Sequence, residues 1–115
     1  MEKRRKTNKL DKTLQKNNIN KISIGNSNLD LNKLIINRGG KKYKINNTEK
    51  LILEKMIQSS GKVFSREEIG KLININKERS IDVIITRLRQ KVETDSKNPQ
   101  YLQTIRGSGY VLWIE

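Results

Sequence analysis

The side chains best suited to chemistry lie in one short stretch, where basic and polar residues recur at helical spacing. Arg79, Val83 and Arg87 stand four residues apart, with Thr86 and Gln90 beside them. All five would share one face of a helix. Arginine donates hydrogen bonds to guanine edges, and a valine methyl can touch a thymine methyl. These residue types at this spacing suit the major groove of DNA.

Asp82 and Arg89 flank this face. An aspartate can accept a hydrogen bond from the cytosine amine, but an acid near a helix start is also stabilised by the helix dipole. For the stretch as a whole, the alternative is a solvated charged face, because single exposed apolar residues such as Val83 are common. The helix alone leaves both interpretations open.

An amphipathic helix over about residues 79–94 must position these side chains. Ile81, Ile85, Leu88 and Val92 recur at helical spacing on the opposite side. This stripe predicts burial against a core.

Composition favours a polyanionic partner. The chain has 115 residues, which indicates one domain, and its formal net charge is +13. Nucleic acid is favoured over an anionic membrane surface. Lys, Asn and Ile are abundant throughout, a bias that can reflect genomic base composition, so the placement of charges is more informative than their number.

The residue inventory also argues against several classes of protein. The chain contains no Cys and no His, which excludes disulfides and the usual zinc motifs. It has no S-x-x-K motif and no Walker-type phosphate loop. We therefore expect no enzyme activity, no cofactor and no metal. No apolar run is long enough to span a bilayer, which predicts a cytoplasmic protein.

Two segments precede the helices. Residues 1–18 are strongly basic and are expected to form a linker or flexible arm, whereas residues 19–115 form the folded domain. Short alternating runs fill residues 19–45, with turns expected at Gly25–Asn28 and Asn37–Gly40. This pattern predicts a small antiparallel meander.

The remaining elements are two capped helices and a hairpin. Asn46 and Ser65 are each followed three residues later by Glu, so each is expected to start a helix with a capping box. Val63 and Phe64 would act as an apolar staple before the second cap. Strands at about 101–106 and 110–114, joined by a Gly-Ser-Gly turn, would form the hairpin. The predicted fold is α+β, a winged helix-turn-helix with three helices, an N-terminal antiparallel sheet and a C-terminal β-hairpin wing.

From about Ile22 to Trp113 the chain resembles the DNA-binding effector domain of OmpR/PhoB-type response regulators. The resemblance rests on segments in a specific order: Asn46–Glu49, Gly61–Ile69, Arg79–Val83, Arg87–Lys91 and Thr104–Tyr110. It implies that a head-to-tail pair binds direct-repeat sites on double-stranded DNA, usually under the control of a phosphorylated receiver domain. Such a protein would regulate transcription within a two-component system.

The resemblance also implies residue roles. Arg79 and Ser80 would contact phosphates at the start of the third helix, and Asp82, Val83, Thr86, Arg87 and Arg89 would face the groove. Thr104 and Tyr110 would contact the DNA backbone, although for Tyr110 a place in the hairpin core is equally consistent with the sequence. Arg106 would enter the minor groove.

The chain departs from the family pattern in three respects. Lys50 stands where an aromatic core residue is common, and Ile84 and Thr86 stand where His and Arg are often found, so the base preference of the family is not carried over to this chain. The chain has no counterpart of the receiver domain's acidic pocket. The resemblance implies contact with RNA polymerase through the loop between the second and third helices, but Asn74–Glu78 is shorter than usual and lacks the common Trp.

Three alternatives to sequence-specific DNA binding remain. One is a non-specific basic protein, and another is an RNA-binding protein, which the aromatic content of only 4% disfavours. The last is a winged helix that binds another protein, which would not need this cluster of arginines.

Overall fold

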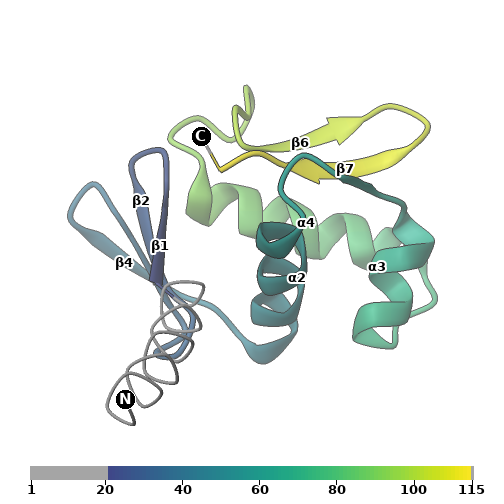
Figure 1. Ribbon diagram of the computed structural model, residues 1–115, viewed down its shortest axis with the longest axis horizontal. Coiled ribbons are helices and arrows are strands. Elements are labelled where there is room, and N and C mark those ends of the chain that lie inside the picture. The colour runs from purple at the N-terminus through teal and green to yellow at the C-terminus, as the bar shows by residue number, and fades with distance from the viewer. Residues whose placement is uncertain (1–20, 115) are drawn as a thin grey trace, which may run out of the picture.

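Seven strands and three helices follow one another along residues 21–114, the part of the chain that the computed structural model describes (Figure 1). Their bounds are β1 Lys21–Ile24, β2 Ser27–Asp30, β3 Ile35–Arg38, β4 Lys41–Lys44, α2 Asn47–Gln58, β5 Val63–Phe64, α3 Arg66–Ile73, α4 Glu78–Val92, β6 Leu102–Ile105 and β7 Gly109–Leu112. This order confirms the predicted α+β winged helix-turn-helix. The predicted arm at 1–18 lies outside the described residues.

The N-terminal sheet is an antiparallel meander in the order β1-β2-β3-β4. Its first turn is tighter than predicted, because Ile24 pairs with Ser27 and only Gly25 and Asn26 form the turn. Gly25 has φ +57°, a conformation that glycine adopts readily. Ser27, predicted to belong to the turn, is a buried strand residue because its hydroxyl donates to the Val92 carbonyl at 2.6 Å.

Both predicted capping boxes are confirmed. The Asn46 side chain accepts from the Glu49 amide while the Glu49 carboxylate accepts from the Asn46 amide, and Ser65 and Glu68 repeat the arrangement at α3. Each exchange satisfies two amides that a helix start otherwise leaves unpaired.

The apolar stripe of α4 is confirmed as buried: Ile81, Ile85, Leu88 and Val92 are at most 2% exposed. Burial of such a side chain contributes roughly 1.5–3 kcal/mol. The helix ends at Val92 rather than at about 94. Glu93 leaves the helix because its carboxylate accepts hydrogen bonds from the amides of the chain that leads into β6.

The wing contains a strand that the sequence did not reveal. Val63 and Phe64, predicted only as an apolar staple, form β5 and pair with β7, so the sheet order is β5-β7-β6. The hairpin strands are shorter than predicted, at 102–105 and 109–112. Gly109 belongs to β7, where a Cβ would lie 2.0 Å from the Phe64 carbonyl oxygen. Only glycine permits this close approach of β7 to β5.

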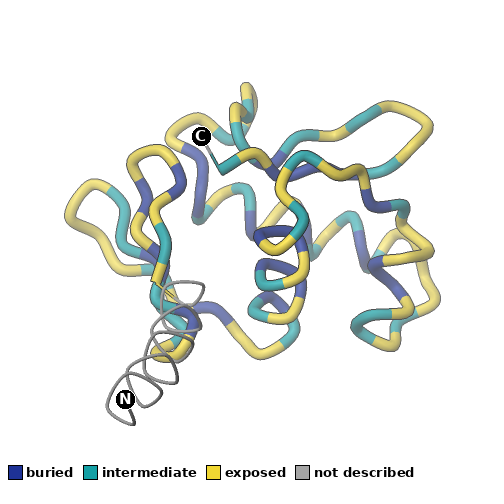
Figure 2. Tube along the Cα trace, viewed as in Figure 1, coloured by how far each residue is buried: buried dark blue, intermediate teal, exposed yellow. Residues whose placement is uncertain are grey.

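The arrangement of these elements leaves one side of α4 uncovered. In Figure 1, α4 crosses the molecule from α3 to the four-stranded sheet, with α2 in front of it and the wing above. The buried segments lie where helices and sheets face each other, whereas the wing turn and the tips of the N-terminal sheet are exposed (Figure 2). The fold therefore holds α4 from several sides and exposes its polar face.

Candidate nucleic-acid interface

The uncovered face of α4 presents the predicted side chains to solvent. Arg79, Thr86, Arg87 and Gln90 are exposed, and Val83 is 43% exposed. They lie outward because the residues between them form the buried stripe of the helix. The ion pairs within residues 21–114 involve Lys62, Arg66 and Lys91 rather than the cations of this face. Arg79 and Arg87 are therefore available to an external anion or hydrogen-bond acceptor.

Thr86 differs from the arginines because its hydroxyl is already bonded. It donates to the carbonyl of Asp82, one turn earlier, at 2.8 Å. This back-bond is a common arrangement for threonine in a helix. Thr86 as a residue remains exposed.

Arg89 lies at the junction between α4 and the wing. Its Nε donates to the Leu102 carbonyl at 2.8 Å, and its terminal nitrogen donates to the Thr104 hydroxyl at 2.9 Å. Both acceptors belong to β6. The structure thus brings the predicted residues Arg89 and Thr104 together and connects α4 to the wing through them.

Asp82 and Tyr110, also predicted as site residues, meet around one carboxylate oxygen. The Tyr110 hydroxyl donates a hydrogen bond to Asp82 Oδ1, and Arg66 Nε donates to the same oxygen at 2.8 Å. The Tyr110 residue is only 5% exposed. Its ring is thus a buried part of the wing, while its hydroxyl contacts α4.

This contact shifts the titration of both groups. Partial burial raises the pKa of Asp82, but the hydrogen bonds from Tyr110 and Arg66 outweigh it and hold that pKa below its ordinary value. Burial, followed by the hydrogen bond to Asp82, raises the pKa of Tyr110. Near neutral pH the carboxylate is therefore ionised and the phenol is protonated, so acceptor and donor keep their roles.

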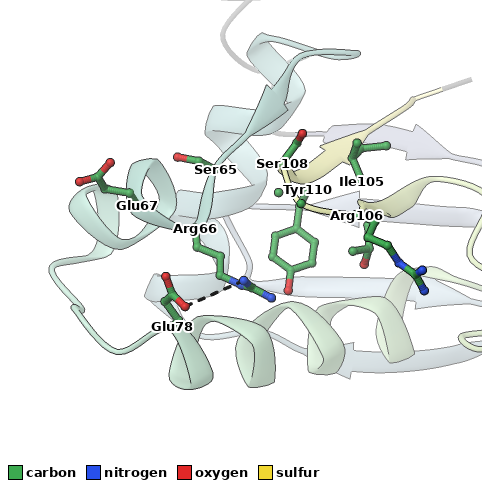
Figure 3. A pocket seen from close by; sticks show the side chains of 11 residues that line it. Ser65, Arg66, Glu67, Glu78, Ile105, Arg106, Ser108 and Tyr110 are labelled. Carbon is green, nitrogen blue, oxygen red and sulfur yellow. Dashed lines mark ion pairs between the residues drawn. The ribbon is translucent and has the colours of Figure 1, made fainter.

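Sequence reasoning missed Arg66. A cation in the first turn of a helix opposes the helix dipole, which costs about 0.3–1 kcal/mol at an exposed site. Arg66 occupies this position in α3, and the conflict was a signal that the residue has partners elsewhere. Those partners are Asp82 and, more distantly, Glu78, whose Oε1 lies 4.0 Å from an arginine terminal nitrogen (Figure 3).

An open cleft of about 370 Å³ separates the wing turn from the starts of α3 and α4. Figure 3 shows the Arg66 side chain beside the Tyr110 ring, with its guanidinium near the tyrosine hydroxyl, whereas the Arg106 side chain extends away from Arg66 and Glu78. Arg106 is exposed, and Gly107 after it has φ +79°, which allows the chain to turn sharply. The Ser108 amide closes the turn on the Ile105 carbonyl at 2.9 Å.

The C-terminal end of α4 is fixed by the four-stranded sheet. Arg38 donates to the carbonyls of Gln90 and Lys91, each at 3.2 Å. The Lys91 ammonium pairs with the buried Glu49 carboxylate at 3.0 Å. The two Arg38 bonds satisfy carbonyls that a helix end leaves unpaired. The sheet, together with Glu49 of α2, therefore sets the position of the helix that carries the exposed face.

The described residues show neither a metal cluster nor a membrane segment. Residues 21–114 contain no group of three or more acidic, Cys or His side chains placed to hold a metal ion. None of their helices combines the length and apolar character needed to cross a bilayer.

Comparison with known proteins identifies the family. Residues 40–112 match the family model described as "Transcriptional regulatory protein, C terminal". The probable transcriptional regulator ycf27 of Cyanidium caldarium is 37% identical over 103 residues, which cover 82% of this chain and 41% of that protein. The chain thus spans less than half the length of the curated relatives it matches.

Solved structures agree. The response regulator DrrB of Thermotoga maritima, an OmpR/PhoB homologue, matches with a TM-score of 0.71 and 27% identity over 82% of this chain and 44% of that one. The DNA-binding domain of the response regulator AdeR, solved in complex with an intercistronic region, matches with a TM-score of 0.60 and 29% identity over 78% of this chain and 96% of that one. The chain therefore belongs to the family of transcriptional regulatory protein C-terminal domains of the OmpR/PhoB type, a family of regulators and not of enzymes.

Proposed function

We propose that this chain binds duplex DNA with sequence preference, placing α4 in the major groove and the wing turn in the adjacent minor groove. The observation that carries the proposal is the exposed face of α4, where Arg79 and Arg87 flank Val83. An α-helix fits the major groove, and arginine and apolar methyl groups read different base edges there.

Within this arrangement Arg87 would donate to a guanine and Val83 would touch a thymine methyl. Arg79 and Ser80 would contact phosphates. Support comes from the start of α4, where Lys77 provides no side-chain cap, in contrast to the starts of α2 and α3. Uncapped amides at a helix N-terminus are donors suited to a phosphate.

The cleft between α4 and the wing supports the same placement. A major groove and its neighbouring minor groove are separated by one sugar-phosphate strand, so a protein that occupies both must leave room for that strand. The cleft lies between the start of α4 and the wing turn, and its polar lining includes Thr104, the cations Arg66 and Arg106, and the acids Glu67 and Glu78. Arg106 would then enter the minor groove, where a narrow A/T-rich sequence attracts arginine.

The family supports a regulatory role. We propose that the chain is the output domain of a two-component response regulator in the cytoplasm, and that two copies bind direct repeats head to tail. AdeR, a relative with a DNA-binding domain of the same fold, was solved in complex with an intercistronic region. The short loop before α4 would provide the contact with RNA polymerase.

Selection of bound sites from random duplex DNA tests the function. We expect enrichment of a short sequence, repeated in tandem, and an affinity that falls steeply with salt because several phosphate contacts release counterions. Competition with duplex RNA and with unrelated DNA serves as the control. Equal affinity for all duplexes would leave only a basic surface and contradict the proposal.

A further inference from the structure

Asp82 presents its two carboxylate oxygens differently. Oδ1 accepts from both Arg66 and Tyr110, whereas within residues 21–114 Oδ2 has no hydrogen-bond partner. The side chain is 37% exposed, and Val83 beside it lies on the outward face of α4. The carboxylate is thus held by one oxygen and open at the other.

The two donors come from two separate elements of the fold. Arg66 is the first residue of α3, and Tyr110 lies in β7, the strand that follows the wing turn. Neither the helix-turn-helix pair nor the wing alone could hold the Asp82 carboxylate in this way. Without these two donors the Asp82 side chain would rotate freely. Fixing it when DNA binds would then cost conformational entropy and lower the affinity.

We propose that Arg66 and Tyr110 are positioning residues that fix Asp82 so that its free oxygen accepts a hydrogen bond from a base amine in the major groove, with cytosine preferred. This inference rests on the proposed function and specifies one of its base contacts. Cytosine offers its N4 amine as a donor, whereas guanine and thymine present acceptors that repel a carboxylate. Adenine offers an amine beside the N7 acceptor, so it is the second choice.

The proposal also gives the wing a part in reading the major groove. Tyr110 pairs with Thr104 across the wing hairpin, and the Thr104 hydroxyl accepts from Arg89 of α4. A displacement of β7 would therefore withdraw the phenol from Asp82. The hydroxyl of Tyr110 therefore couples the docking of the wing to base selection by α4.

The test is the base preference of variants at every position of the selected site. Tyr110→Phe keeps the ring and the net charge but removes the donor, and Arg66→Gln removes the ion pair. We expect Asp82→Asn to abolish the cytosine preference at one position, and both positioning variants to reduce it roughly fivefold to tenfold at that same position. Arg66→Lys should recover part of it, since lysine keeps the charge but not the geometry of the guanidinium.

Two controls separate positioning from charge and folding. Lys71→Gln removes a cation from the exposed side of α3, and it should weaken all sites about equally while the cytosine preference stays. Thermal unfolding of each variant establishes that it is folded under the binding conditions. Tyr110→Phe alone decides the matter if Arg66→Gln does not fold.

The outcomes distinguish this inference from the proposed function. A wild-type chain without any sequence preference would contradict the function itself. A selective wild-type chain whose preference is unchanged by Asp82→Asn would overturn the base contact. Unchanged selectivity in Tyr110→Phe and Arg66→Gln, with Asp82→Asn altered, would overturn the positioning role.

Discussion

The two ends of α4 are held differently. Buried or half-buried groups form hydrogen bonds at its C-terminal end. Its N-terminal end has no side-chain cap and contacts a partly exposed ionic cluster. Arg38 and Ser27 bind the last carbonyls of the helix, and Glu93 binds the chain beyond it. At the other end Asp82 meets Arg66 and Tyr110 at the edge of an open cleft.

The difference follows from what each end faces. Hydrogen bonds among buried groups are electrostatically stronger than those in water, and an unpaired buried group is costly. The C-terminal end is therefore set by folding alone. The N-terminal end retains donors and an acceptor for a ligand, since exposed groups remain hydrated without a protein partner. The helix is thus anchored at one end and chemically available at the other.

Removal of the C-terminal anchor should have the largest effect. Glu93 is 2% exposed, and its carboxylate accepts from the amides of Gln100, Tyr101 and Leu102 at 2.8, 2.9 and 2.7 Å. Glu93→Ala leaves these donors without a charged acceptor and should cost roughly 3 kcal/mol or more of unfolding free energy. Urea denaturation measures this loss of unfolding free energy. Asp95→Ala, in an exposed turn, is the matched control, and equal losses in the two variants would contradict the contrast between buried and exposed groups.

The exposed face should affect binding rather than folding. Arg87→Ala is expected to cost about 1–3 kcal/mol of binding free energy and to relax the preference at one base pair. Arg79→Ala, at the start of the helix, should weaken all sites about equally and reduce the salt slope by roughly one. Site selection with both variants, at several salt concentrations, measures these effects. Identical selectivity profiles for the two variants would contradict the assignment of Arg87 to base contact and of Arg79 to phosphate contact.

The wing should contribute a smaller effect that depends on the flanking sequence. Arg106→Ala is expected to lose several-fold affinity on sites whose wing-facing flank is A/T-rich, because a narrow minor groove has an enhanced negative potential. Arg106→Lys should recover only part of the loss, since arginine is more weakly hydrated than lysine and enters the groove more readily. Binding to one core site with A/T-rich or G/C-rich flanks measures both. The same loss on the two flanks would assign Arg106 to general phosphate contact.

The smallest effect concerns pH. The folded pKa of Asp82 lies below its ordinary value of 3.8, so its cluster stabilises the fold above the unfolded pKa, and this contribution is lost as pH falls through the folded pKa. Tyr110→Phe should raise the pKa of Asp82, because a donor to the carboxylate is removed. Carbon-13 NMR titration of the Asp82 carboxyl group detects the change. An unaltered pKa would show that the N-terminal cluster does not act through this hydrogen bond.

Local interactions made much of the fold predictable. The capping boxes at Asn46 and Ser65 join residues three apart, and the stripe from Ile81 to Val92 follows the period of a helix. These patterns lie within a few residues, so the sequence displays them directly. β5 escaped prediction because a strand of two residues is too short to show alternation. The exposure of Arg79 and Arg87 also followed from periodicity, since residues opposite a buried stripe must face outward.

Tertiary structure decided which of the polar residues are already engaged. Arg66 lies 16 residues from Asp82, and Tyr110 lies 28 residues from it. At the other end of the helix, Arg38 and Lys91 are 53 residues apart. No periodicity relates such pairs, because their distance depends on how α3, the wing and the sheet pack around α4. The sequence by itself determined that α4 would present a basic face, and only the packing of its neighbours determined that Asp82 would be held there by one oxygen.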